Sequence, residues 1–83
     1  MTKEECVELM CELRHEDRYK VSISYYCYEW IVQITEKEPM MGVMYVSPTL
    51  SKILGSYEYS IQTNGGGWQG MRLHVFKRQG GEL

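Results

Sequence analysis

The most constraining feature of this sequence is a stretch near its end in which two alternating segments flank a run of glycines. Tyr57, Tyr59 and Ile61 alternate with polar residues, and alternation returns in residues 68–78. Between the two segments, residues 64–67 are Asn-Gly-Gly-Gly, which supplies the positive φ angles that a hairpin loop needs. The sequence therefore predicts two antiparallel strands joined by a hairpin.

The last strand is expected to have two unlike faces, because successive side chains of a strand point in opposite directions. One face carries apolar side chains, namely Met71, Leu73 and Val75. The opposite face carries Arg72, His74, Phe76 and Arg78. Residues 79–83 follow the strand and are expected to fray.

Residues 20–35 form a second region of alternation. Val21, Ile23 and Tyr25 share one parity, whereas Trp30 and Val32 share the other, so the parity changes near residues 26–27. Such a change indicates either a β-bulge in one long bent strand or a tight turn between two strands. The bulge is favoured, because residues 26–29 contain none of the usual turn formers. A short strand is then expected over residues 43–46.

Two helices are predicted from their end signals. Thr2 and Glu5 form a capping box, and apolar residues at helical spacing follow it until the helix fades near residues 17–19. Ser47 and Pro48 are typical of an N-cap and a first helical position, and Gly55 is placed to end the second helix. The buried sides are expected to carry Cys6, Leu9, Met10 and Leu13 in the first helix and Leu50, Ile53 and Leu54 in the second.

These elements predict one small α+β domain over residues 1–83. The order is α-β-β-α-β-β, that is, two αββ units in tandem. The simplest architecture is one antiparallel sheet with both helices packed on one face. Because two helices cannot cover both faces, the other face should be wet or should meet a partner.

The first helix carries an acidic ridge, which we define as Glu4, Glu8, Glu12 and Glu16. A spacing of four residues places these carboxylates along one side of a helix. A solvated helix face explains the ridge, and a docking strip for a basic partner surface is the functional interpretation.

The sequence has a surplus of tyrosines. Half-buried sheet faces explain them, and association is the functional interpretation, since tyrosine is enriched at interfaces. Seven of the ten aromatic residues are tyrosines, and an aromatic outer face on a small domain suggests a partner. We therefore expect a non-enzymatic protein–protein interaction module, for instance a small inhibitor of the phage or mobile-element kind, and homodimerisation is a further option. The residues expected to bind the partner are the acidic ridge together with Tyr26, Trp68 and Phe76.

Two alternatives use the glycine-rich hairpin and the last strand. The first is a small-molecule or nucleotide binder, and the second is a nucleic-acid-binding domain with an indole that stacks on bases. Their candidate residues are Asn64, Gly66, Trp68, Arg72, His74 and Arg78. A net charge of −2 and only three cations on that strand disfavour nucleic acid.

No catalytic motif, cofactor motif or metal motif is present. Cys11 and His15, together with Cys27 and His74, lack the spacing of zinc sites. Three cysteines make a poor disulfide framework and favour a reducing compartment, so a cytoplasmic location is expected. No apolar run is long enough to span a membrane.

Overall fold

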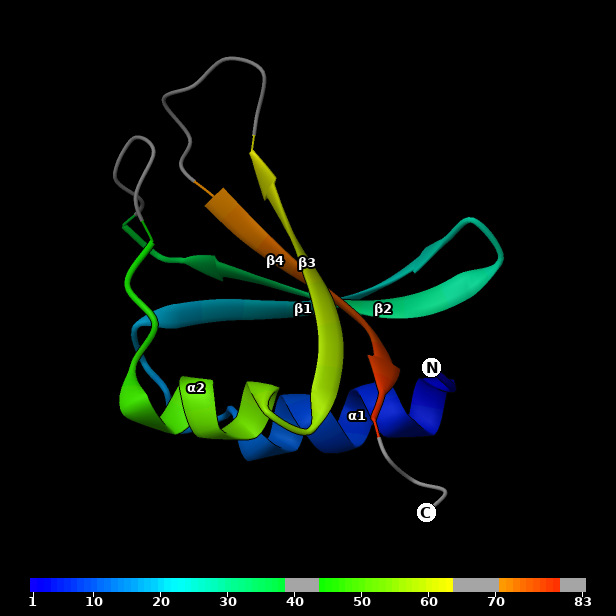
Figure 1. Cartoon of the computed structure of the whole chain (residues 1–83), viewed down its shortest axis with the longest axis horizontal. Helices are drawn as coiled ribbons and strands as arrows, with labels where there is room; N and C mark the ends of the chain where they lie inside the picture. Colours follow the sequence, from blue (N-terminus) through cyan, green and yellow to red (C-terminus); the bar gives the residue numbers. More distant parts are fainter. Residues whose placement is uncertain (39–43, 64–70, 80–83) are drawn as a thin grey trace.

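The computed structural model describes residues 1–38, 44–63 and 71–79, and these form two helices and a four-stranded antiparallel sheet (Figure 1). This confirms the predicted α+β fold. The loop at residues 64–67 and the tail at residues 80–83 lie outside the described residues. The elements, in chain order, are α1 (Lys3–Glu12), β1 (Tyr19–Tyr26), β2 (Glu29–Glu36), α2 (Pro48–Leu54), β3 (Tyr57–Thr63) and β4 (Met71–Arg78).

The strands lie in the order β1-β2-β4-β3, so the second strand of each αββ unit is central. The seam between the units is the β2–β4 pairing, in which Val32 lies opposite Val75 and Ile34 opposite Leu73. All four side chains are at most 2% exposed, so the seam is the centre of the hydrophobic core. Both units therefore contribute to one core.

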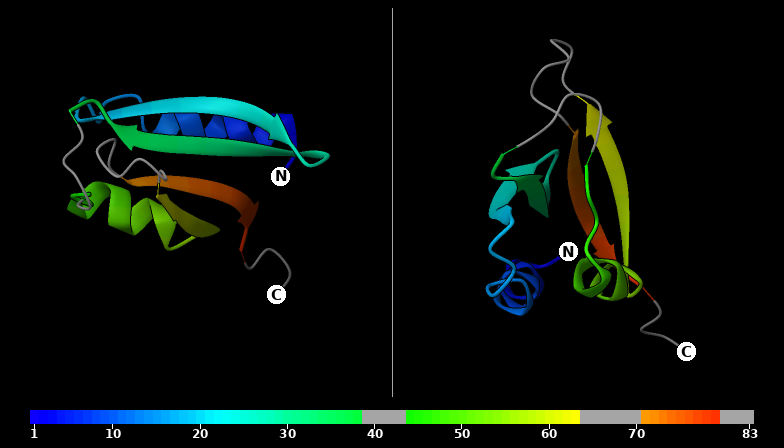
Figure 2. Two further views of the ribbon diagram at one scale, coloured as in Figure 1. Left: turned by 90° about the horizontal axis from the view of Figure 1, so that it is seen from above. Right: turned by 90° about the vertical axis from the view of Figure 1, so that its left-hand side faces the viewer.

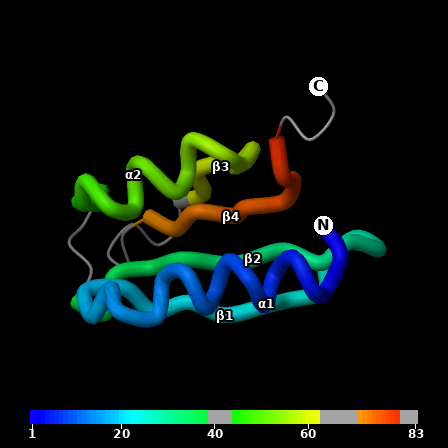
Figure 3. The backbone as a smooth tube through the Cα atoms, turned by 90° about the horizontal axis from the view of Figure 1, so that it is seen from below, coloured from blue at the N-terminus to red at the C-terminus, as the bar shows by residue number. Residues whose placement is uncertain are grey.

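Both helices lie on the same side of the sheet (Figure 2, Figure 3). On this side of the sheet, α1 runs along β1 and β2, and α2 lies by the β3–β4 half (Figure 3). Figure 1 shows the opposite face without cover from any described element. We call this second surface the open face. The core between the sheet and the helices consists of Cys6, Leu9, Leu13, Tyr19, Val32, Ile34, Leu50, Leu54, Tyr57, Leu73 and Val75.

The two helix starts form as their sequence signals indicate. Thr2 accepts a hydrogen bond from the Glu5 backbone N–H, and the Glu5 side chain accepts one from the Thr2 N–H, which completes a capping box. Ser47 caps α2 by accepting from the Leu50 N–H at 3.1 Å. Helix α1 ends at Glu12, earlier than predicted, because the chain turns to reach β1.

The parity change in residues 20–35 is a tight turn, so the favoured bulge is wrong. Cys27 and Tyr28 have φ angles of 52° and 67°, and the flanking residues Tyr26 and Glu29 pair directly. Two central residues with positive φ are the signature of a type I′ hairpin turn. The turn folds both alternating blocks onto one face, so that Ile23 pairs with Val32.

The expected strand over residues 43–46 is also wrong for its described part, since residues 44–46 form no strand. The backbone of this segment bonds to side chains instead. The Tyr45 N–H donates to Glu36, and the Tyr45 carbonyl accepts from the Tyr19 hydroxyl. These bonds satisfy both backbone groups of Tyr45 without a strand partner.

A β-bulge between β3 and β4 changes the face of one predicted site residue. Tyr57 pairs with Arg78 and Glu58 with Lys77, but Tyr59 pairs with Val75, so Phe76 has no partner in the ladder. The extra residue reverses the alternation beyond it. Arg78 therefore lies on the helix side with the buried Tyr57, and not on the open face with His74 and Phe76 as predicted.

Candidate functional site

The open face carries a hollow of about 290 Å³, to which every strand of the sheet contributes. We call it the open-face hollow. It lies where the end of the β1–β2 hairpin meets the middle of β3 and β4. Its lining residues are Tyr26, Cys27, Glu29, Ile31, Ser60, Gln62, His74 and Phe76.

The apolar part of the open-face hollow is formed by Tyr26, Ile31 and Phe76. Ile31 points to the open face, because its neighbours Trp30 and Val32 belong to the helix side, yet it is only 6% exposed. Tyr26, by contrast, is 64% exposed. Ile31 thus forms an apolar floor, and the exposed ring of Tyr26 lies at the rim of the hollow. Such a ring can close over a group that enters the hollow.

His74 is the titratable group at the centre of this surface, since it pairs with Gln33 on one side and Ser60 on the other. Its Nε2 is buried and has no hydrogen-bond partner within the described chain. Burial, assisted by the charge of Arg72, lowers the pKa of His74. The imidazole is therefore neutral at neutral pH and adds no charge to the open-face hollow.

The turn at Cys27 and Tyr28 projects beside this hollow. Tyr28 is 91% exposed, and both turn residues occupy the left-handed region that favours glycine. Cys27 lines the hollow and carries a free, exposed thiol. A large exposed ring on a rigid two-residue turn offers contact area at little cost in conformational entropy.

The acidic ridge lies on the opposite side of the molecule. Glu8 accepts a hydrogen bond from Arg78 at 3.3 Å, in an ion pair whose two side chains are both at least half exposed. Glu12 borders a groove between the helices, of about 480 Å³, which also holds Lys52 and Arg78. Burial, and then the charge of Glu12, raise the pKa of Tyr57 in this groove. Part of the ridge charge is thus offset by cations of the same chain.

Glu16 does not continue the ridge, because α1 ends at Glu12. Its carboxylate accepts a hydrogen bond from the Ser47 hydroxyl at 2.7 Å. The Ser47 backbone N–H in turn donates to the Tyr19 hydroxyl at 2.9 Å. Glu16 therefore helps to fix the start of α2.

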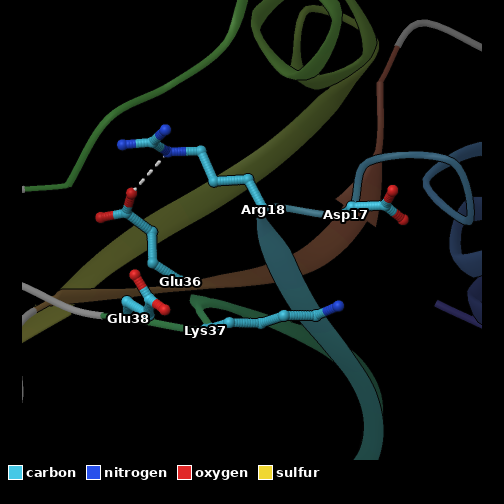
Figure 4. Close-up of a pocket in the computed structure, with 5 residues that line it drawn as sticks. All are labelled: Asp17, Arg18, Glu36, Lys37 and Glu38. Carbon is cyan, nitrogen blue, oxygen red and sulfur yellow. Dashed lines mark hydrogen bonds and ion pairs between the residues drawn. The ribbon is translucent and has the colours of Figure 1, made fainter.

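A second polar cluster surrounds the largely buried Glu36, which is 8% exposed (Figure 4). Arg18 donates to it at 2.8 Å, and the Tyr45 backbone N–H donates at 3.3 Å. The Arg18 guanidinium also lies 4.5 Å from the centre of the Tyr45 ring. Asp17, Lys37 and Glu38 line the same pocket of about 380 Å³, but in Figure 4 the side chains of Asp17 and Lys37 point away from the ion pair.

Arg18 and Glu36 at the centre of this cluster are paired with each other, and Glu36 also accepts from the Tyr45 N–H. The cluster therefore holds the segment before α2 in place. The sequence offers no signal for it. Its members are 18 or 9 residues from Glu36 in the chain, and no local motif links them.

The predicted site residues are therefore distributed over two surfaces. Tyr26 and Phe76 come together with His74 around the open-face hollow, whereas the acidic ridge and Arg78 lie on the helix side. Arg72 pairs with Thr35 and Gln62 and belongs to the open face. Asn64, Gly66 and Trp68 lie outside the described residues. Sequence reasoning missed Glu29, Ser60 and Gln62 as lining residues of one site.

The described residues hold no group of three or more His, Cys, Asp or Glu side chains that could bind a metal ion. Cys6 is buried, and burial raises the pKa of its thiol, which makes it a poor nucleophile. Cys11 and Cys27 are free and exposed. None of the helices in the described part of the chain is long and apolar enough to cross a membrane.

Comparison with known proteins returns no relatives. No protein-family model, curated protein or solved structure matches this chain.

Proposed function

We propose that this chain is a non-enzymatic protein–protein interaction module that binds its partner on the open face of the sheet. The observation that carries the proposal is the open-face hollow, with Ile31 as an apolar floor and Tyr26 and Phe76 around it. Interfaces derive most of their binding energy from a few anchors that fill such hollows, and aromatic residues dominate among them.

The dimensions of the open-face hollow favour a side chain of a partner over a small molecule. At about 290 Å³ it is slightly smaller than the roughly 300–1,000 Å³ that is usual for ligand sites. Its charged lining is limited to Glu29, because His74 is neutral at neutral pH. One large apolar residue fits this chemistry, and the polar Ser60 and Gln62 at the other side suit a hydrogen-bonded rim.

Docking through the acidic ridge, as a phage-type inhibitor would do, has weaker support. Glu8 is already paired with Arg78, and Glu12 shares the interhelical groove with Lys52. Glu16 is bonded to Ser47 and is not part of the helix. The free thiols are consistent with action in a reducing compartment such as the cytoplasm, which we include in the proposal.

The test is a peptide-display selection against the immobilised chain. The enriched binders are expected to carry an aromatic or large aliphatic anchor. Their affinity should fall at least about tenfold in Tyr26→Lys or Phe76→Lys, because a charge then enters the site of the anchor. Tyr25→Lys is the matched control, since Tyr25 is 58% exposed, close to the 64% of Tyr26, but lies on the helix side.

Two results would contradict the proposal. One is a selection that enriches no binder sensitive to Tyr26 or Phe76. The other is a set of binders that Glu8→Lys abolishes and Tyr26→Lys leaves unchanged, which would restore the acidic ridge as the interface. A thermal-shift screen with nucleotides tests the ligand alternative in parallel, because a ligand that binds the folded state raises the melting temperature.

A further inference from the structure

Strand β3 forms one edge of the sheet, and its helix-side face is only partly covered. Tyr57 at its start is 4% exposed, but Tyr59 and Ile61 are 43% and 57% exposed. Both residues pair with core residues of β4, so their side chains lie on the helix side of the sheet. Figure 1 shows why both are exposed, since α2 ends at the start of β3 and does not reach its far half. Two large apolar side chains are thus left open at a sheet edge.

Edge strands are usually protected against pairing by lysines, prolines, bulges, inward-pointing charges or short length. The bulge beside β3 places its extra residue, Phe76, in β4, so β3 itself is regular. Strand β3 reads Tyr-Glu-Tyr-Ser-Ile-Gln-Thr, and Glu58 is its one charged residue. The other edge, β1, differs from it. Strand β1 carries Lys20, and α1 lies over its helix side in Figure 3. The exposed apolar residues of β1 are confined to its hairpin end. The unprotected edge is therefore β3.

The sequence of β3 is complementary to itself in the antiparallel direction. A two-fold axis at Ser60, the midpoint of the strand, pairs every residue from Tyr57 to Thr63. In this register Tyr59 of one copy lies opposite Ile61 of the other, which is a stabilising aromatic–aliphatic pair. Glu58 lies opposite Gln62, so the two carboxylates do not face each other.

We propose that two copies of this chain associate by antiparallel pairing of their β3 edges about Ser60. The two four-stranded sheets then form one continuous sheet. Tyr59 and Ile61 of each copy cover those of the other copy, and the backbone groups of β3 that face away from β4 gain partners. Because Ser60 and Gln62 line the open-face hollow, the two hollows come to lie side by side on one surface. This interface uses the edge and the helix side of β3, whereas the partner site proposed above lies on the open face, and the two adjoin at Ser60 and Gln62.

Sedimentation equilibrium of the full chain across the micromolar range tests the proposal. The expected mass is twice the 9.8 kDa of one chain. Ile61→Lys should raise the dissociation constant of the dimer at least about tenfold, since it places a charge against Tyr59. Tyr25→Lys is the control for the loss of an equally exposed apolar residue, and should leave the mass unchanged. A mass of 9.8 kDa throughout, or a dimer that Ile61→Lys does not weaken, overturns the proposal.

The register has its own test. In a background with Cys11→Ser and Cys27→Ser, Ser60→Cys places two thiols next to each other across the axis. A short bismaleimide should then link the copies, because directly opposed Cβ atoms lie about 4.5–5.5 Å apart. Ser22→Cys, on the same face of the β1 edge, is the control and should give no linked dimer. Failure of Ser60→Cys to link, or equal linking in Ser22→Cys, overturns the proposed pairing.

Discussion

Replacing the two residues of the β1–β2 turn should stabilise the protein. Cys27 and Tyr28 have positive φ angles of 52° and 67°, yet neither is a residue that favours this conformation. Asn-Gly is the preferred pair for a type I′ turn, because asparagine tolerates the left-handed region and glycine has no Cβ to clash. We therefore expect Tyr28→Gly, and more strongly Cys27→Asn with Tyr28→Gly, to raise the free energy of unfolding.

The magnitude follows from two opposing effects. A non-glycine residue in the left-handed region costs roughly 1–2 kcal/mol. Glycine avoids this cost but loses about 0.5–1 kcal/mol more in backbone entropy on folding. Tyr28 is 91% exposed, so its side chain contributes few contacts. Tyr28→Gly should therefore gain about 0.5–1 kcal/mol, and the double variant about 1–2 kcal/mol, a rise of roughly 5–15 °C in Tm for a domain of this size.

Urea unfolding monitored by circular dichroism measures this gain. Tyr28→Ala is the matched control, because it removes the same exposed ring and keeps the Cβ atom that causes the strain. It should stay within about 0.5 kcal/mol of the wild type. Ser24→Gly, within β1, should instead destabilise by about 0.5–1 kcal/mol. If Tyr28→Gly is no more stable than Tyr28→Ala, strain in this turn is not what limits stability.

Three further predictions concern the packing around the sheet. Glu36→Ala should lower the free energy of unfolding by about 1–3 kcal/mol in urea titrations, because the bonds from Arg18 and the Tyr45 N–H are lost; a variant as stable as the wild type would show that the cluster is dispensable. His74, whose folded pKa lies below its ordinary value of 6.5, binds a proton more readily in the unfolded chain. The free energy of unfolding should therefore fall as the pH drops from 6.5 towards the folded pKa of His74. Urea titrations at a series of pH values measure this fall, and it should be smaller in His74→Gln. Thr2→Ala removes the cap of α1 and should cost about 1 kcal/mol, and an unchanged urea midpoint would argue against the cap.

Local signals predicted most of the fold. The capping box at Thr2 and the Ser47-Pro48 start both mark real helices, because each depends on residues no more than three positions apart. The alternation in residues 57–61 likewise predicts β3, because a sheet with one buried face imposes a period of two. In these elements sequence and structure agree, since the determinants are contained in a few neighbouring residues.

The failures have a common physical origin in contacts that no short window contains. The turn at Cys27 carries no glycine or asparagine, and its geometry is imposed by the pairing of Ile23 with Val32. The bulge that moves Arg78 to the helix side depends on the register between β3 and β4. The open-face hollow could not be predicted either, since Ile31 and His74 come to line one hollow only after the two units have paired.

The seam between β2 and β4 also constrains how the chain is made. While the first αββ unit leaves the ribosome alone, β2 is an edge strand, and Val32 and Ile34 lack the neighbours that bury them completely in the finished fold. This exposure lasts until β4, which follows β2 by more than 30 residues in the sequence, has been synthesised. Burial of the seam therefore waits for the second αββ unit, and the nascent first unit is the stage at which a chaperone has the most to protect.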